Sequence, residues 1–399
     1  MNTSTRLGVL LLGCGLLAAC PDDDAAVVAA GGGTATLQAT DLTTRIDHAP
    51  IPVLGSDGRY HLTYEIELTN TTADRLTFAR VDVRDAQKGT TVASFDAAAV
   101  AARMVLRDRA ATPGSLGAAQ WAFLYLHVAF DDLPSVPRRL EHVLSFTRGT
   151  APAVVTETSA RTAVGTSTEL VLDAPLRGAR YIAGDGCCDS TRHVRATLSV
   201  DGGWYTAQRF AIDWEQLDAQ GRIYLGDPKL PASYVIYGKP AYAVADAEVE
   251  AAVDGLPDTP PGGFPAGITL DQADGNHVVL NLGDGRYALY AHFRPGSVKV
   301  SKGDRVRRGQ VLGEVGTSGN SSEPHLHFHV MDGPSALASN GLPYRLRSFT
   351  ATSKGVSTAA FDQAIIDGKP IATEAVAGAA LRERVMPMDL WIVDLEVAP

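Results

Sequence analysis

The sequence contains little cysteine, no excess of positive charge and, beyond its N-terminal segment, no long apolar run. Four cysteines occur among 399 residues, and the formal net charge is −10. Because no basic excess is available to neutralise phosphates, nucleic acid is excluded as an expected partner. No later stretch is apolar over the length needed to span a bilayer. The sequence is nevertheless 45% hydrophobic and longer than a usual single domain, which predicts two folded domains with extensions.

Several catalytic motifs with well-defined mechanics are also missing. The sequence has no glycine-rich phosphate-binding loop, no nucleophile elbow of a serine hydrolase and no H-E-x-x-H helix. It also shows no internal repeat with a period of about 20 to 50 residues. These absences disfavour nucleotide hydrolases, serine hydrolases, helical zinc proteases and solenoid arrays.

The N-terminal segment has the features of an export signal. Arg6 precedes an apolar stretch at residues 7–17 that is too short to anchor the chain across a bilayer. The sequence Leu17-Ala18-Ala19-Cys20 then resembles the lipobox of bacterial lipoproteins, which implies acylation of Cys20 and attachment to a membrane surface, on the periplasmic face of either the inner or the outer membrane. The alternative is an ordinary signal peptide in which Cys20 is incidental. Residues 21–40 begin with an acidic, glycine-rich run that predicts a flexible tether.

Two cysteines remain after Cys14, which lies in the signal, and Cys20. They are the neighbours Cys187 and Cys188. Adjacent cysteines in an exported protein predict either a vicinal disulfide or unreactive thiols. A metal-binding role is disfavoured, because two adjacent sulfurs rarely point at the same ion.

Residues 41–150 show the alternation of a half-buried β structure. Apolar and polar side chains alternate at residues 60–68 and 76–83, and turn residues separate these runs. Short strands spaced by turns predict an immunoglobulin-like β-sandwich. A short helix is expected at residues 97–103, with Asp96 as its N-cap. No group of residues here could carry out chemistry, so a spacer or binding module is expected.

Strand signals return in the second half of the chain. Two alternating runs flank Gly283-Asp284-Gly285, which predicts an antiparallel hairpin. A last strand is expected at residues 390–396, reached through a helical stretch near residues 373–384. The predicted fold is therefore mainly β, with an antiparallel domain following the sandwich.

The motif Pro-His-Leu-His-Phe-His-Val at residues 324–330 is the strongest chemical signal. On a strand, His325, His327 and His329 would share one face, because successive side chains alternate. Neutral histidine is the commonest metal ligand, and zinc accepts its nitrogens readily. The alternative is a hydrogen-bonded ladder of surface histidines.

Several further motifs lie before the histidine motif in the sequence, and the last of the series contains it. They are Gly-Asn-His-Val-Val at 275–279, Tyr-Ala-His-Phe at 290–293, Val-Ser-Lys-Gly-Asp-Arg-Val-Arg-Arg-Gly-Gln-Val-Leu-Gly at 300–313 and Gly-Thr-Ser-Gly-Asn-Ser-Ser-Glu-Pro-His-Leu-His-Phe at 316–328. The series resembles the lysostaphin/LytM-type metallopeptidases, zinc endopeptidases that mostly cut peptide cross-links of bacterial cell walls. The resemblance covers residues 231–330 strongly and residues 209–214 more loosely.

The resemblance implies roles for particular residues. His327 corresponds to a zinc ligand, and His292 and His325 correspond to catalytic histidines beside the metal-bound water and the substrate carbonyl. Zinc can bring the pKa of bound water to about 7 and polarise the scissile carbonyl. Histidines can transfer the proton and stabilise the oxyanion.

One ligand position departs from the family pattern. The family has H-x-x-x-D there; this chain has Asp213 but Arg209 in place of the histidine, and arginine stays protonated and cannot bind zinc. In one hypothesis His193, on a preceding strand, supplies the missing nitrogen through a hairpin turning at Asp201. In the other, the site is incomplete and the chain binds the wall or regulates another hydrolase. His277 is expected to be structural, and His329 either supports the site or is exposed.

These observations predict a zinc-dependent endopeptidase acting on peptidoglycan stem or cross-bridge peptides, with Zn²⁺ held by His193, Asp213 and His327. The alternative is a non-catalytic relative. Oligomeric state is not indicated. The expected organisation is a lipoprotein signal peptide (1–20), tether (21–40), β-sandwich (41–150), linker (151–168), lysostaphin-like domain (169–349) and C-terminal extension with a final strand (350–399).

Overall fold

The computed structural model describes residues 39–106, 112–166, 170–376 and 380–395. Residues 40–399 group into one compact unit. The expected signal peptide, Cys20 and nearly all of the expected tether lie outside the described residues. Within the described part of the chain, no helix combines the length and the apolar character needed to cross a membrane.

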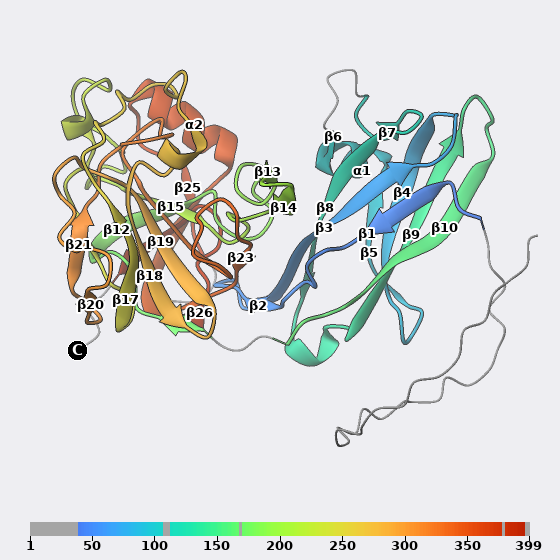
Figure 1. Cartoon of the computed structure of the whole chain (residues 1–399), viewed down its shortest axis with the longest axis horizontal. Coiled ribbons are helices and arrows are strands. Elements are labelled where there is room, and N and C mark those ends of the chain that lie inside the picture. Colours follow the sequence, from blue (N-terminus) through green and yellow to red (C-terminus); the bar gives the residue numbers. More distant parts are fainter. Residues whose placement is uncertain (1–38, 107–111, 167–169, 377–379, 396–399) are drawn as a thin grey trace, which may run out of the picture. The chain divides into compact units, whose positions relative to one another are not determined.

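The first half of the described chain forms two five-stranded sheets around one core (Figure 1). One sheet contains β1 (Leu42–Arg45), β2 (Val53–Leu54), β3 (Tyr60–Asn70), β6 (Met104–Leu106) and β8 (Trp121–Phe130). The other contains β4 (Leu76–Asp85), β5 (Thr91–Asp96), β7 (Ser115–Leu116), β9 (Arg139–Arg148) and β10 (Val154–Ala163). Alternate residues of both sheets point inward, as expected for a sandwich. Its immunoglobulin-like character stays a prediction.

Two local predictions in this region have different outcomes. The helix α1 (Ala97–Arg103) is present, and the carboxylate of Asp96 accepts the backbone N–H of Ala99 at 2.8 Å, as predicted for an N-cap. The linker assigned to residues 151–168 is wrong over Val154–Ala163, which forms β10 and pairs with β9. This edge strand buries few side chains and is rich in threonine, alanine and serine, so its alternation is weak in the sequence.

The second half is organised around one large sheet. Its main path runs β11-β24-β27-β12-β15-β22-β19-β18-β17-β20, with β23, β25 and β26 attached at its sides. These strands are β11 (Val171–Leu172), β12 (Gly178–Gly184), β15 (Ile212–Gln216), β17 (Ala247–Val253), β18 (Asn276–Gly283), β19 (Arg286–Phe293), β20 (Arg305–Val306), β22 (Leu326–Met331), β23 (Gly341–Leu342), β24 (Arg345–Gly355), β25 (Thr373–Glu374), β26 (Ala380–Val385) and β27 (Trp391–Leu395). All pairs are antiparallel except β11 with β24. The predicted mainly β fold with antiparallel sheets is confirmed.

Smaller elements complete this region. Two small antiparallel pairs lie apart from the large sheet: β13 (Leu198–Val200) with β14 (Gly203–Tyr205), which form a hairpin, and β16 (Pro240–Tyr242) with β21 (Val311–Glu314), which lie far apart in the sequence. Short 3-10 turns lie at η1 (Leu133–Ser135), η2 (Pro231–Ser233) and η3 (Leu270–Gln272). The predicted hairpin across Gly283-Asp284-Gly285 is confirmed as β18 and β19, and the predicted last strand as β27.

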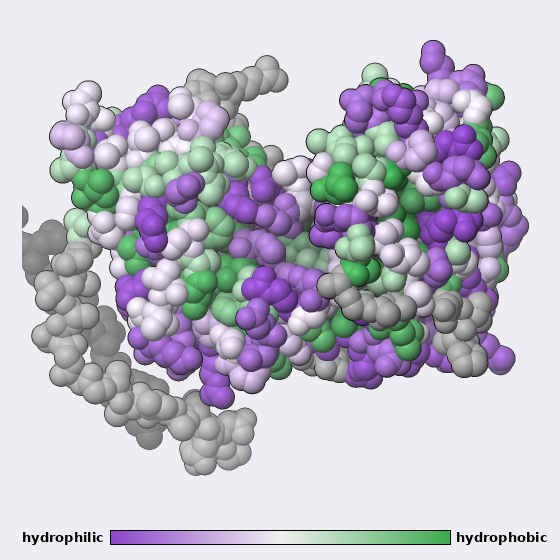
Figure 2. All heavy atoms as spheres, turned by 180° about the vertical axis from the view of Figure 1, so that it is seen from behind, coloured by the Kyte–Doolittle hydropathy of each residue, from purple (hydrophilic) through white to green (hydrophobic). Residues whose placement is uncertain are grey.

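The C-terminal helix was predicted at the wrong place. The helix α2 spans Thr358–Asp367, whereas Ala380–Val385 forms β26 and pairs with β24. The hydroxyl of Ser357 accepts the N–H of Ala360 at 3.1 Å and begins α2, and Gly368, with a φ of 63°, ends it. Near residue 380, pairing with a neighbouring strand overrides the helix propensity of an alanine-rich sequence. On the face shown in Figure 2, hydrophilic residues are interspersed with hydrophobic ones.

Candidate active site

Strand register brings the expected site residues together. In the pairing of β15 with β22, Asp213 lies directly opposite His327. In the pairing of β19 with β22, Ala291 lies opposite His327, which places the next residue, His292, at the same end of the sheet. His325 immediately precedes β22. Residues from three neighbouring strands therefore meet at one point, although they lie far apart in the sequence.

The Asp213 carboxylate is the centre of this group. Its Oδ1 lies 2.7 Å from Nδ1 of His327 and 3.5 Å from Nε2 of His325. Its Oδ2 lies 3.2 Å from Nε2 of His193. The three histidines are buried, while the Asp213 side chain keeps an exposed fraction of 20%. A carboxylate with three imidazoles around it is a donor set that suits a divalent cation such as zinc.

His193 reaches the site by a route different from the predicted one. It lies in a turn-rich segment between β12 and β13, not on a strand; the predicted hairpin at Asp201 exists, but it pairs β13 with β14 and does not contain His193. Nδ1 of His193 donates to the carbonyl oxygen of Asp185 at 3.0 Å, which directs Nε2 toward the Asp213 carboxylate. The predicted proximity of His193 and Asp213 is present, and the predicted strand is wrong.

The imidazole rings of His292 and His325 are each oriented by a hydrogen bond from Nδ1 to a backbone carbonyl group. Nδ1 of His292 donates to the carbonyl of Ser318 at 2.7 Å, and Nδ1 of His325 donates to that of Glu323 at 2.8 Å. Each ring therefore keeps Nε2 unprotonated in its neutral form. The two ring centres lie 4.7 Å apart. His292 has a φ of 67°, a left-handed backbone conformation that is rare for a side chain of this size and often marks a functional position.

Burial and the shared carboxylate set the pKa values of this cluster. Burial opposes the charged form of His193, but the Asp213 carboxylate outweighs it and raises the pKa of His193 to about 9. Burial would likewise raise the pKa of Asp213, but His193, His325 and His327 hold it well below its usual range. Burial lowers the pKa of His292 and of His327, so these rings favour the neutral form that can accept a proton or bind a metal.

Within this cluster, two groups of donors have the spacing of a metal site. They are His193, Asp213 and His327, and His292, His325 and His327; in each group the ligand atoms lie within 4.8 Å of one another. Only the first includes a carboxylate, which offsets the charge of a divalent cation. Two nitrogens and one carboxylate oxygen also match the donors that catalytic zinc sites use. The residues present therefore fit zinc.

Arg209 does not take part in the site. Its guanidinium is buried and donates to both carboxylate oxygens of Glu65 on β3, at 2.7 and 2.9 Å. The arginine that replaces the family histidine thus pairs with the sandwich rather than facing Asp213. No local pattern indicates this partner, because Glu65 lies in a strand with ordinary alternation of apolar and polar residues.

The other histidines have supporting or separate positions. His329 is fully buried, and its Nδ1 lies 2.9 Å from Nε2 of His327, so it contacts the site rather than solvent. His277 Nδ1 bonds the carbonyl of Gly275 at 2.9 Å. It belongs to neither donor group, which agrees with the structural role expected for it.

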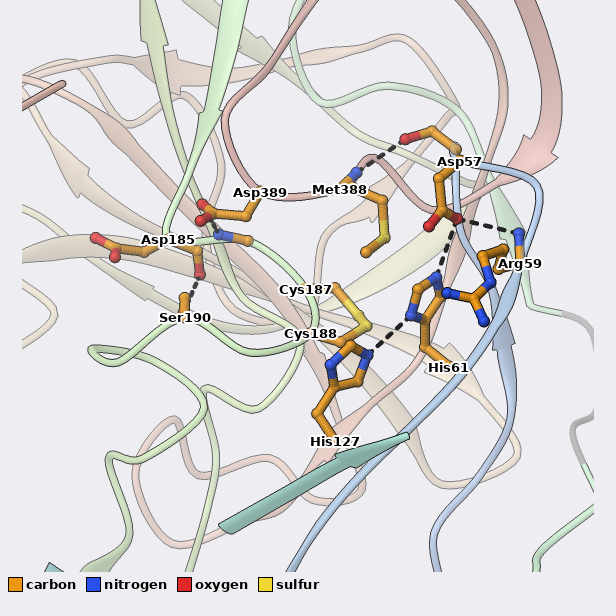
Figure 3. Close-up of a disulfide and its surroundings, with 12 residues drawn as sticks. Asp57, Arg59, His61, His127, Asp185, Cys187, Cys188, Ser190, Met388 and Asp389 are labelled. Atoms are coloured by element: carbon orange, nitrogen blue, oxygen red, sulfur yellow. Dashed lines mark hydrogen bonds and ion pairs between the residues drawn. A yellow bond between two sulfur atoms is a disulfide. The ribbon is translucent and has the colours of Figure 1, made fainter. Parts of the chain in front are cut away.

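Cys187 and Cys188 form a disulfide (Figure 3). A disulfide between these neighbours was one of the two predicted alternatives. Beside it, Nδ1 of His61 lies 2.9 Å from Nε2 of His127, and Asp57 bonds the other nitrogen of His61 at 3.0 Å. Cys188 groups with these two histidines in space. Because its sulfur is bonded to Cys187, it is not available as a metal ligand in the disulfide form.

A cavity of about 480 Å³ opens beside Asp213. Its lining residues are Gly184, Asp185, Arg192, Asp213, Glu215, Pro228, Lys229, Tyr234, Pro261, Gly262, Gly263, Ser322, Glu323, Phe361, Asp362, Ile365 and Ile366. Burial, with the neighbouring carboxylates of Glu323 and Asp213, raises the pKa of Glu215. Glu215 was not predicted as a site residue, although its place two residues after Asp213 on a strand puts both side chains on one face.

The family comparison matches this region of the chain. Residues 234–339 match the model of Peptidase family M23. This part of the chain is therefore a peptidase family M23 domain, and it contains His292, His325 and His327. His193 and Asp213 lie before the matched residues.

Curated relatives share a short part of the same region. The chain is 45% identical over 58 residues to the glycyl-glycine endopeptidase ALE-1 of Staphylococcus capitis, covering 14% of this chain and 16% of that protein. It is 37% identical over 57 residues to the peptidoglycan DD-endopeptidase ShyA of Vibrio cholerae, covering 14% and 13%. The matches thus span less than a fifth of either relative. The catalytic domain of lysostaphin from Staphylococcus simulans aligns at 21% identity with a TM-score of 0.23, covering 41% of this chain and 88% of that one.

Proposed function

We propose that this chain is a zinc-dependent endopeptidase that hydrolyses peptide bonds in peptidoglycan stem or cross-bridge peptides. One observation carries the proposal: Nε2 of His193 lies 3.2 Å from Asp213, and the two residues share one donor group with His327. The two relatives named as endopeptidases support the reaction class. The pairing of Arg209 with Glu65 is consistent with a ligand supplied from elsewhere in the chain.

In this proposal His193, Asp213 and His327 hold the zinc ion, which when bound supplies a Lewis acid and lowers the pKa of a water molecule. His292 and His325 act on the reacting groups. Each has Nδ1 fixed by a backbone carbonyl and Nε2 available, so one can accept a proton while its protonated form donates to the oxyanion or to the leaving amine. His329 orients His327 through their 2.9 Å contact, as the outer partner of a metal-binding histidine does.

The proposal also covers the cellular location of the protein and the roles of its segments. We infer that the chain is exported and held on the periplasmic face of a membrane by acylated Cys20, with residues 41–150 acting as a spacer or binding module. Residues 169–349 would form the peptidase domain, followed by the extension at residues 350–399. An enzyme of this kind needs access to the wall rather than to the cytoplasm, which agrees with the lipobox-like sequence before Cys20.

The test is the zinc content of the soluble form that lacks residues 1–33. We expect about one zinc per chain, as for a catalytic site with three protein ligands. His193→Ala, Asp213→Ala and His327→Ala should each lose it, and the matched control His277→Ala should retain it. Wild-type protein that stays free of metal in excess zinc would refute the enzyme proposal. Retention of zinc by His193→Ala alone would show that another residue supplies the third ligand.

A further inference from the structure

The cavity beside Asp213 has a wall that the family match does not include. The matched region ends at residue 339, whereas α2 spans Thr358–Asp367 and lines the cavity with Phe361, Asp362, Ile365 and Ile366. Asp213 belongs to the same lining. A substrate bound at the candidate zinc site would therefore have part of its chain beside α2.

The charges in the cavity are not balanced. Besides Asp213, four carboxyl groups line it: Asp185, Glu215, Glu323 and Asp362. The guanidinium of Arg192 pairs with two of them, at 2.6 Å from Asp185 and 3.1 Å from Asp362. Lys229 also lines the cavity but is exposed and, among the described residues, forms no ion pair. Glu215 and Glu323 form no ion pair in the described part of the chain, although the charge of Arg192 is near enough to act on Glu215.

Glu215 is the more unusual of the two. Its exposed fraction is 2%, and its Oε2 atom has no hydrogen-bond partner among the described residues. Oδ1 of Asp185, on the same lining, is also buried without one. Glu323 accepts a hydrogen bond from Ser322. A buried acceptor left without a donor costs free energy, so Oε2 of Glu215 calls for a donor such as an ordered water molecule, an ion or a ligand group in the cavity.

We propose that this cavity is a subsite for a primary ammonium group carried by the peptide substrate, with Glu215 and Glu323 as its acceptors. An ammonium group is compact and brings a positive charge and three N–H donors to Glu215 and Glu323, which form no ion pair with Arg192 or Lys229. The apolar side chains of Phe361 and Ile365 on α2 would contact the aliphatic stem that carries it. This inference rests on the proposed endopeptidase function and names the feature by which substrates are chosen.

The kinetic test compares purified peptidoglycan with the same material after N-acetylation of its free amines by acetic anhydride. Wild-type protein should cleave the unmodified wall at least about tenfold faster, the effect expected from one charge-assisted hydrogen bond. Glu215→Gln and Glu323→Gln should each bring the ratio of the two rates close to one. Glu383→Gln, an exposed acid on β26 outside the cavity, should leave the ratio unchanged. Zinc content of every variant shows whether the neighbouring site is intact.

A binding test separates this inference from the proposed function. The probes are Ac-Ala-Lys-Ala-NH₂ and the same peptide acetylated on its lysine, titrated into the whole protein lacking only residues 1–33. Preferred binding of the free amine, lost in Glu215→Gln and in Glu323→Gln, supports the subsite even if no bond is cleaved. Equal cleavage of both wall samples together with equal binding of both peptides would overturn the subsite and leave the endopeptidase proposal standing.

Discussion

Breaking the ion pair between Arg209 and Glu65 should destabilise the protein strongly. Both side chains are buried, and one guanidinium nitrogen contacts both carboxylate oxygens. Replacing Glu65 by Gln leaves the guanidinium charge buried without its counter-charge. Removing one partner of a buried pair costs about 3 to 5 kcal/mol, so we expect a loss of unfolding free energy in that range. Arg209→Met should show a similar loss, because it leaves the Glu65 carboxylate buried.

The double variant Glu65→Leu/Arg209→Met provides the control. Removing both charges together should recover most of the lost stability, because an apolar pair of similar volume often replaces a buried ion pair without cost. The assay is urea unfolding followed by tryptophan fluorescence, with the midpoints and slopes of all four proteins compared. Single variants that lose less than about 1 kcal/mol would refute the reasoning, since a value so small is typical of a solvent-exposed pair.

Three further predictions follow from other contacts. Arg209→His should not increase the zinc content, because position 209 is directed toward Glu65; a second equivalent of zinc would contradict this geometry. Lowering the pH should weaken the sandwich: burial lowers the pKa of His142 to about 4, so the unfolded chain, with a pKa near 6.5, binds the proton first. The stability that His142 contributes is therefore complete above about pH 6.5, and the unfolding free energy falls by up to about 3 kcal/mol toward pH 4. Urea unfolding at several pH values measures this decline, which should be smaller in His142→Gln. Asp96→Ala should cost about 1 kcal/mol by removing the N-cap of α1, which a lowered Tm would detect and an unchanged Tm would refute.

Features that depend on local sequence were predicted well. The placement of His325, His327 and His329 on one side follows from the alternation of a strand, and the Gly283-Asp284-Gly285 turn defines its hairpin. The N-cap of α1 was also predicted from one aspartate before an alanine-rich stretch. Each of these three features depends only on residues that are close together in the sequence, within a single strand, turn or helix start.

Features that depend on distant pairing could not be predicted in the same way. The register that sets Asp213 opposite His327 joins β15 to β22 across more than a hundred residues, and only the family pattern indicated it. His193 was named for its chemistry, but its position in a turn, held by the Asp185 carbonyl, has no periodic signal. The helix α2 was missed because its apolar face packs against neighbouring residues that the local pattern does not specify.

The order of strands in the large sheet affects when the site can form during synthesis. The strand β12, which precedes His193, lies between β15 and β27, and Gly178 of β12 pairs with Leu395 at the far end of the described chain. Until β27 has emerged, β12 has an open edge with unpaired backbone groups. A nascent or C-terminally shortened chain would therefore lack the support that places His193 beside Asp213. The candidate site is thus completed by a strand at the other end of this half of the chain, and we expect His193 and Asp213 to come together only after β27 has been made.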